Sequence, residues 1–241
     1  MTDPPNTKSG SPLLFIASDR RELQPWVSRW DNLRSLQLPV HWAKAGTWRG
    51  KEAIAIANGV GTRRAAGAID AAITLSRTFA GIFSVGTGGA LDTSLSLADV
   101  VVAKCVTDGQ TTWPALDPAG QPARFGLVRT VPHIARTAAE KTNLREAGAI
   151  LVEMEAAAVA TAASQLVVPF YCVRVVSDLA NETFFIDFEQ FLMPNGGFNV
   201  PRLVMHALRH PVEGLPELLR LQQRTSAAAK KLGEFLSHCN F

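Results

Sequence analysis

Short apolar runs alternate with stretches of helical periodicity along almost the whole chain, and this alternation most constrains the fold. Apolar runs bounded by Gly, Pro, Asp or Ser are typical of buried strands. Strands are expected at residues 13–17, 40–45, 51–57, 81–85, 99–106, 149–153 and 170–176. Helices are expected at residues 22–31, 62–78, 132–138, 141–146, 156–166, 200–209 and 216–236. Strands that alternate with helices in this way indicate an α/β domain.

The length and composition of the chain limit what it can be. It has 241 residues, of which 47% are hydrophobic and 19% are charged, so it can bury a sizeable core. Residues 1–12 are polar and rich in Pro, Ser and Gly, and we expect a flexible tail before a single domain over residues 13–241. A net charge of +3 without long basic runs argues against a nucleic-acid partner. The apolar runs are too short for a membrane span, and the three scattered cysteines favour a reducing cytoplasmic location.

Two glycine-rich turns follow predicted strands, where open α/β sheets bind their ligands. In "NGVGTRR", Gly59 and Gly61 open a predicted helix, but Arg64 stands where a dinucleotide-binding turn needs its third glycine. A structural turn is therefore favoured there over an anion-binding loop. In "SVGTGGALD", residues 86–89 place Thr87 among three glycines, which suits either a ligand loop or a tight strand bulge.

Several charged residues lie in apolar segments, where a charge needs a partner or a function. Glu153 and Glu155 lie in "AILVEMEAAAVA", where a strand is expected to pass into a helix. The helix dipole favours one glutamate there, but it explains two less well. Arg174 lies inside the apolar strand of "PFYCVRVVSD" and requires a nearby carboxylate. Asp178 ends that strand, where it either caps a helix or projects into a cleft as a partly buried acid.

Three segments, in this order, resemble the nucleoside phosphorylase/nucleosidase superfamily: "SVGTGGALDTSLSLADVVVA", "LVEMEAAAVA" and "VRVVSDLA". The resemblance covers about residues 13–192 and is to the methylthioadenosine/S-adenosylhomocysteine nucleosidases in particular. "FIASDRREL" is similar to the first strand of that family and to the turn that carries its first catalytic glutamate. "TAAEKTNL" and "NGGFNVPRLVMHALRHP" resemble the hopanoid-associated phosphorylase-like branch. The resemblance implies a three-layer α/β/α sandwich with a mixed central sheet.

The resemblance also implies a function, which is cleavage of the N-glycosidic bond of a 5′-substituted, adenine-type purine nucleoside by water. It makes Asp178 the general acid that protonates the leaving base at N7, and burial of an acid favours its neutral form. It makes Glu22 the base that activates water, and Glu155 the acceptor of hydrogen bonds from the ribose hydroxyls. Glu153 either caps a helix or pairs with Arg174. The other implied residues are Met154 on the ribose, Thr87, Gly88 and Ser177 near the substrate, Phe188 over the base, and Arg174 and Glu153 behind the site.

Two other functions stay open. A purine nucleoside phosphorylase would use phosphate as a co-substrate, and candidates for its phosphate site are Arg20, Arg21, Arg63 and Thr87. A nucleoside-binding protein without catalysis would be favoured by the loss of Asp178 or Glu155, and both residues are present. The resemblance implies no metal, no other cofactor and a homodimer. The phenylalanines of "NETFFIDFEQFLMP" are expected to be mostly core, and some of them are candidates for an apolar pocket around the 5′-substituent.

Overall fold

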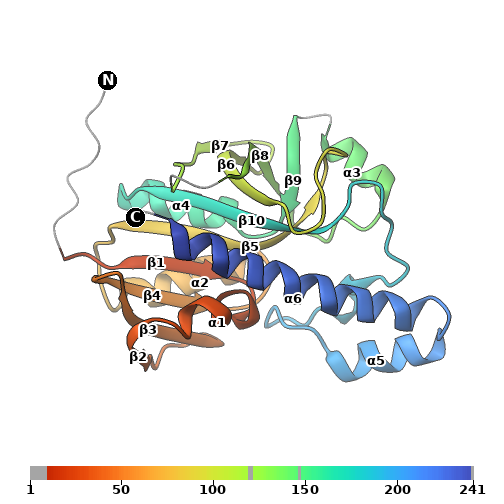
Figure 1. The fold of residues 1–241 in the computed structure, drawn as a ribbon, viewed down its shortest axis with the longest axis horizontal. Helices are drawn as coiled ribbons and strands as arrows, with labels where there is room; N and C mark the ends of the chain where they lie inside the picture. The colour runs from red at the N-terminus through yellow and green to blue at the C-terminus, as the bar shows by residue number, and fades with distance from the viewer. Residues whose placement is uncertain (1–9, 119–121, 146–147, 240–241) are drawn as a thin grey trace.

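The computed structural model describes residues 10–118, 122–145 and 148–239, so most of the expected tail lies outside the described residues. A ten-stranded mixed sheet lies between two layers of helices, which confirms the predicted three-layer fold (Figure 1). The strands are β1 (Leu13–Ala17), β2 (Asp31–Ser35), β3 (Trp42–Trp48), β4 (Lys51–Ala57), β5 (Gly81–Ala90), β6 (Val100–Thr107), β7 (Thr112–Pro114), β8 (Arg124–Thr130), β9 (Ala149–Glu153) and β10 (Phe170–Asp178). The helices are α1 (Arg20–Val27), α2 (Thr62–Ile73), α3 (Ala138–Arg145), α4 (Ala156–Leu166), α5 (Val200–Arg209) and α6 (Gly214–His238), with a short 3-10 helix, η1 (Phe188–Phe191).

Strand β5 is the branch point of the sheet. Its first residues pair in parallel with β1, residues 82–89 pair in parallel with β10, and its last two residues pair antiparallel with β9. Because β10, β6, β8 and β9 also pair with one another in that order, these five strands close into a ring. The closure brings the carboxyl ends of β5, β9 and β10 together at one place.

Two glycines of β5 allow this close approach. A Cβ atom on Gly88 would lie 2.5 Å from a side-chain carbon of Leu151 in β9, and one on Gly89 would lie 2.7 Å from Oδ2 of Asp178 in β10. Any larger residue would push the neighbouring strands apart. The segment "SVGTGG" is therefore a tight strand meeting point, and its glycines make room for Asp178.

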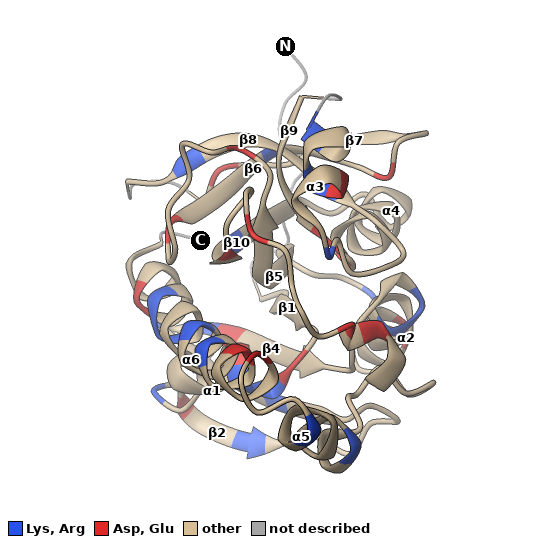
Figure 2. Cartoon of the chain, turned by 90° about the vertical axis from the view of Figure 1, so that its right-hand side faces the viewer, with Lys and Arg blue, Asp and Glu red and all other residues tan. Residues whose placement is uncertain are grey.

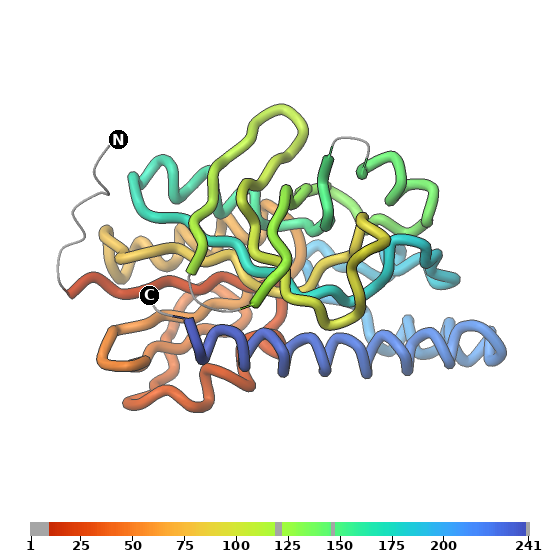
Figure 3. The backbone as a smooth tube through the Cα atoms, turned by 45° about the horizontal axis from the view of Figure 1, so that its top comes forward, coloured from red at the N-terminus to blue at the C-terminus, as the bar shows by residue number. Residues whose placement is uncertain are grey.

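The side chains of β1 point alternately to two cores on opposite faces of the sheet. Phe15 packs with Trp26 of α1 and with residues of α6, whereas Ile16 packs with Ile69 of α2 and Val159 of α4. Helix α6 runs along one side of the molecule (Figure 3) and carries charges of both signs (Figure 2). Among the described helices, none has both the length and the apolar character needed to cross a membrane.

The predicted bounds are confirmed for β1, β4, β9, α4 and α5. The helix predicted over residues 132–138 is wrong, because that segment is a loop up to Ala138, where α3 begins. The helix predicted over residues 141–146 is part of α3 as far as Arg145, and Glu146 lies outside the described residues. The predicted helix over residues 62–78 ends early, at Ile73. Strands β2, β7 and β8 were not predicted, since all five residues of β2 are exposed and β8 begins and ends with polar residues.

Candidate active site

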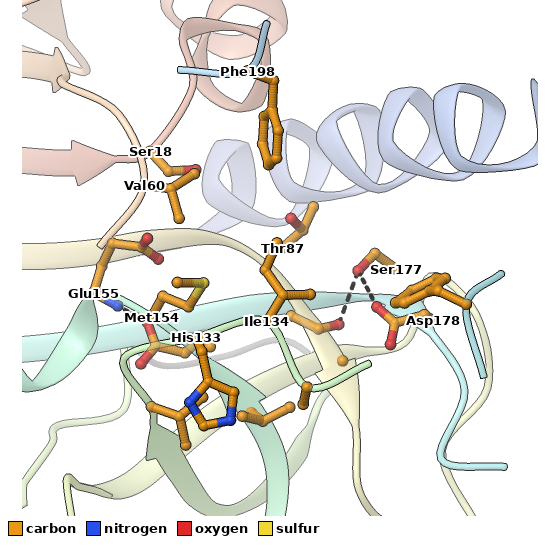
Figure 4. A pocket seen from close by; sticks show the side chains of 17 residues that line it. Ser18, Val60, Thr87, His133, Ile134, Met154, Glu155, Ser177, Asp178 and Phe198 are labelled. Atoms are coloured by element: carbon orange, nitrogen blue, oxygen red, sulfur yellow. Dashed lines mark hydrogen bonds between the residues drawn. The ribbon is translucent and has the colours of Figure 1, made fainter. Parts of the chain in front are cut away.

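Two cavities adjoin at the meeting point of β5, β9 and β10. The smaller one has a volume of about 180 Å³, and its wall includes Thr87, Glu155 and Asp178 (Figure 4). In this view Glu155 and Asp178 lie on opposite sides of the cavity, with Thr87 between them. The larger cavity, of about 730 Å³, is lined by residues of α1 and α6. The residues that line both cavities are Ser18, Val60, Thr87 and Phe198.

Asp178 ends β10, and only 7% of its surface is exposed. Its Oδ1 accepts a hydrogen bond from the Ser177 hydroxyl at 2.8 Å, and that hydroxyl also lies 3.1 Å from the carbonyl oxygen of Gly88. Its Oδ2 accepts a hydrogen bond from Nζ of Lys141 at 2.6 Å. Asp178 is therefore buried, as expected from the sequence, and it is also paired with a buried cation.

Glu153, which lines the smaller cavity, forms an ion pair with Arg174, and each side chain is 1% exposed. Nη2 of Arg174 donates hydrogen bonds to Oε2 of Glu153 at 2.6 Å and to the Ser84 hydroxyl at 2.7 Å. Oε2 of Glu153 also accepts from two backbone N–H groups at the start of α4, at 2.8 and 2.9 Å. The Thr130 hydroxyl donates to its other oxygen. Glu153 thus has both of the roles considered for it, since it caps α4 and pairs with Arg174.

Glu153→Gln should lower the free energy of unfolding by about 3–5 kcal/mol, because it leaves Arg174 as a buried charge without a carboxylate. Urea unfolding followed by tryptophan fluorescence measures this loss. The matched control is Glu155→Gln, which keeps the ion pair and should not show the same loss. If Glu153→Gln unfolds at the same urea concentration as the native protein, the pair does not stabilise the fold.

Glu155 lies at the N-terminus of α4, and its Oε1 accepts a hydrogen bond from the backbone N–H of Gly61 at 2.7 Å. One N–H group of the turn "NGVGT" therefore holds a carboxyl group of the site, and Val60 of the same turn lines both cavities. Burial, followed by repulsion from the Glu153 carboxylate, raises the pKa of Glu155 to about 8. Met154 lies beside Glu155 on the wall of the smaller cavity (Figure 4).

The raised pKa of Glu155 should make the stability of the fold depend on pH. The pKa is about 8 in the folded chain and 4.5 ordinarily, so between these values the folded chain holds a proton that the unfolded chain has released. Raising the pH through this window should lower the free energy of unfolding, by at most ~1.4 kcal/mol per pH unit. The melting temperature of Glu155→Gln should therefore fall less than that of the native protein between about pH 5 and pH 8. A parallel decline in both proteins would contradict the raised pKa.

Glu22 connects the start of α1 to β5. Its Oε2 accepts hydrogen bonds from the Ser18 hydroxyl at 3.0 Å and from the backbone N–H groups of Ser18 and Asp19 at 3.2 and 3.1 Å. Its Oε1 accepts from the backbone N–H of Thr87 at 2.8 Å and from the Thr87 hydroxyl at 3.1 Å. A Cβ atom on Gly86, whose φ is 151°, would lie 2.8 Å from that oxygen. The carboxylate is therefore held in one place on the wall of the larger cavity, beside a residue that lines both cavities.

The three arginines considered for a phosphate site do not come together in the smaller cavity. Arg20 and Arg21 line the larger cavity, and Arg21 forms an ion pair with Asp19 at 2.5 Å. Arg63 is exposed on α2 and is absent from the described walls of both cavities. Of these arginines, Arg20 is the one that lines a cavity and has no ion pair among the described residues.

Phe188 does not line either cavity in the described part of the chain, so the structure does not bring it to the place that the sequence suggested. It is buried with Phe191 and with Leu203 of α5, and α5 packs over the 3-10 helix that carries it. Its ring makes an edge contact with Phe184, which lines the smaller cavity in its place. Phe184 is one of the phenylalanines considered from the sequence for an apolar pocket. Wall residues that the sequence did not single out include Val131, His133, Ile134, Ala135 and Phe198. Phe198 lies in "NGGFNVPRLVMHALRHP", the segment that resembles the hopanoid-associated branch.

The sequence model of the Phosphorylase superfamily matches residues 116–196, which include Lys141, Glu153, Glu155 and Asp178. A 5′-methylthioadenosine/S-adenosylhomocysteine nucleosidase of Staphylococcus aureus (strain bovine RF122 / ET3-1) is 31% identical over 141 residues. That match spans 46% of this chain and 62% of the length of the relative.

Solved structures extend the likeness over almost the whole chain. The S-adenosylhomocysteine nucleosidase of Streptococcus pyogenes, in complex with 5-methylthiotubericidin, has a TM-score of 0.73 at 18% identity and covers 95% of both chains. The 5′-methylthioadenosine/S-adenosylhomocysteine nucleosidase of Neisseria meningitidis, with methylthio-immucillin-A, has a TM-score of 0.72 at 17% identity, covering 94% of this chain and 97% of its own. A mutant futalosine hydrolase of Helicobacter pylori has a TM-score of 0.72 at 15% identity, covering 94% and 96%. The predicted resemblance is thereby confirmed: the chain matches the phosphorylase superfamily over residues 116–196 and has the fold of these nucleosidases over nearly its whole length.

Proposed function

We propose that this protein cleaves the N-glycosidic bond of a 5′-substituted adenine nucleoside with water. The observation that carries the proposal is that Asp178 and Glu155 face one small cavity from opposite sides (Figure 4). An acid on one side suits the leaving base, and carboxyl oxygens that accept hydrogen bonds on the other side suit the ribose hydroxyls. The relatives described above are named for nucleosides of this kind.

In the proposed reaction the C1′–N9 bond breaks and its electron pair stays with the base. Asp178 passes a proton to N7, so the base leaves as a neutral molecule. The ribose becomes cationic, and Glu155 stabilises it through hydrogen bonds to its hydroxyls. Glu22 accepts a proton from water as the water oxygen bonds to C1′. Ser177 orients Asp178, and the Glu153–Arg174 pair holds the backbone from which Glu155 projects.

Phosphorolysis is the second candidate, because Arg20 lines the larger cavity without an ion pair among the described residues. Phosphate bound there would lie on the same wall as the Glu22 carboxylate, which would repel it. Arg21 offsets this repulsion less, since Asp19 already neutralises it. Water is not repelled and gains from a fixed base, so hydrolysis is favoured.

Chromatography of adenosine, 5′-methylthioadenosine and S-adenosylhomocysteine after incubation with the protein tests the proposed function. Free adenine should appear with all three, and faster with the two 5′-substituted nucleosides. Tight binding of all three without release of adenine would instead show a nucleoside-binding protein. We also propose the homodimer and the cytoplasmic location that the resemblance implies, and gel filtration at micromolar concentration tests the dimer.

The larger cavity is the proposed site of the 5′-substituent, since it adjoins the smaller one at Val60, Thr87 and Phe198. Its wall is apolar at Pro25 and Trp42. Lengthening the 5′-alkylthio chain of an adenosine analogue should therefore tighten binding, by up to about 0.8 kcal/mol for each buried methylene. Calorimetry of the series measures this gain. Affinity that does not change with chain length would place the substituent in solvent.

A further inference from the structure

Lys141 is a buried cation in a helix that is otherwise mostly polar and exposed. Its side chain has no exposed surface, which is rare for lysine. Nζ donates hydrogen bonds to Oδ2 of Asp178 at 2.6 Å and to the carbonyl oxygen of Leu179 at 2.8 Å. It also lies 5.3 Å from the centre of the Phe184 ring, and Phe184 lines the smaller cavity. Helix α3 thus places the ammonium group of Lys141 against Asp178, the acid of the proposed reaction.

This contact conflicts with the simplest form of acid catalysis. The proposed function requires Asp178 to give a proton to N7, but in this structure its Oδ2 accepts a hydrogen bond from the Lys141 ammonium group. A carboxylate without a proton cannot protonate N7. At a separation of 2.6 Å, one ammonium proton lies on the hydrogen bond to the carboxylate and can transfer along it.

We propose that the proton delivered to the base is held by the Lys141–Asp178 pair, with Lys141 as a positioning residue that supplies it through Asp178. The inference rests on the proposed function. The Nζ–H bond breaks as an O–H bond forms on the Asp178 carboxyl, which leaves a neutral amine and a neutral acid. The acid then loses its proton to N7 as the C1′–N9 electron pair moves to the base. After the base leaves, the amine takes a proton from a solvent water, and Glu22 gives the proton it took from the attacking water to the hydroxide that remains.

The surroundings of the pair suit both of its forms. The Ser177 hydroxyl has one hydrogen and lies within reach of two acceptors, Oδ1 of Asp178 and the carbonyl oxygen of Gly88. It can donate to an ionised Asp178, or donate to Gly88 and accept from a protonated Asp178. A nucleoside in the cavity would displace water, and a drier site favours the neutral pair over two separate charges.

Three other carboxylates near the Lys141–Asp178 pair each contact a basic side chain. Glu182 follows β10 and forms an ion pair with Arg224 of α6 at 2.8 Å. Glu140 precedes Lys141 on α3 and lies 2.5 Å from the ring nitrogen of His133, which is also on the cavity wall. On β9 and β10, Glu153 is bound to Arg174, and Glu155 is the remaining carboxylate of the cavity.

The pH dependence of adenine release by Lys141→Met tests the proposal. Without the amine, the Asp178 carboxyl has to take its proton from solvent, which supplies fewer protons as the pH rises. Turnover should therefore be within about tenfold of the native rate near pH 5 and at least about 100-fold lower near pH 8. The native protein should show no such fall over this range. A profile parallel to the native one would make Lys141 purely structural, and an alkaline limb moved to higher pH would show that it merely acidifies Asp178.

Lys141→Arg is the second variant, and it decides the matter if the methionine variant does not fold. Arginine keeps the positive charge and the ion pair, but it does not give up its proton in proteins. It should therefore fail to restore turnover near pH 8, whereas full activity would overturn the proposal. Thermal unfolding of each variant shows whether it is folded when assayed. If the native protein releases no adenine, the proposed function fails, whereas activity that is insensitive to Lys141 sinks this inference alone.

Discussion

Asp178→Asn should lower the rate of adenine release by about two to four orders of magnitude. Asparagine keeps the shape of the side chain and can still accept a hydrogen bond from Lys141, but it has no carboxylic proton to give to N7. A steady-state assay with 5′-methylthioadenosine, followed by chromatography of adenine, measures the loss.

The matched control for this prediction is Asp70→Asn, which changes an exposed aspartate on α2 and should leave the rate unchanged. Asp178→Asn also leaves the Lys141 ammonium without its carboxylate, so the variant should be less stable than the native protein. The assay is therefore run below its melting temperature. Near-native turnover by a folded Asp178→Asn protein would remove Asp178 from the mechanism.

Glu22→Gln should lower the rate of cleavage by about two to four orders of magnitude, with a much smaller effect on nucleoside binding. The amide oxygen can accept from Thr87, but an amide cannot take a proton from water. Binding is measured with a nucleoside analogue that resists cleavage, so that the chemical step is separated from affinity.

One structural cost accompanies this change, because the amide NH₂ group would face N–H donors at Ser18 and Asp19 or at Thr87. We expect a loss of about 1–3 kcal/mol of stability from that mismatch. The control is Glu52→Gln on the exposed end of β4, which should alter neither stability nor rate. A native rate in Glu22→Gln would show that Glu22 only caps α1.

The sequence predicted the structure best in segments whose own apolar pattern or motif is clear. β1, β4 and β9 are apolar runs that read as buried strands, and their bounds agree with the structure. Glu155 and Asp178, singled out by their motifs, both line the smaller cavity. The sequence does not predict β2, because that strand has no buried face. It does not predict β8 either, because charged residues flank the apolar residues of that strand.

The features that sequence reasoning missed depend on contacts between distant segments. Lys141 and Asp178 are 37 residues apart, and nothing local in "AAEKTNLR" shows that the lysine is buried. The exclusion of Phe188 from the cavity depends on α5, which follows it and packs over it. Burial of a charge predicts a carboxylate partner for Arg174, and that partner is Glu153, for which the sequence left open both pairing and capping.

The most direct test of the proposed hydrolysis is the sugar product formed in phosphate buffer, observed by phosphorus and proton NMR during cleavage of 5′-methylthioadenosine. We expect adenine and the free sugar in equal amounts, an unchanged phosphate signal, and the same rate when phosphate is left out. A sugar 1-phosphate that accumulates in phosphate buffer, with no cleavage in its absence, would contradict hydrolysis and make the protein a phosphorylase.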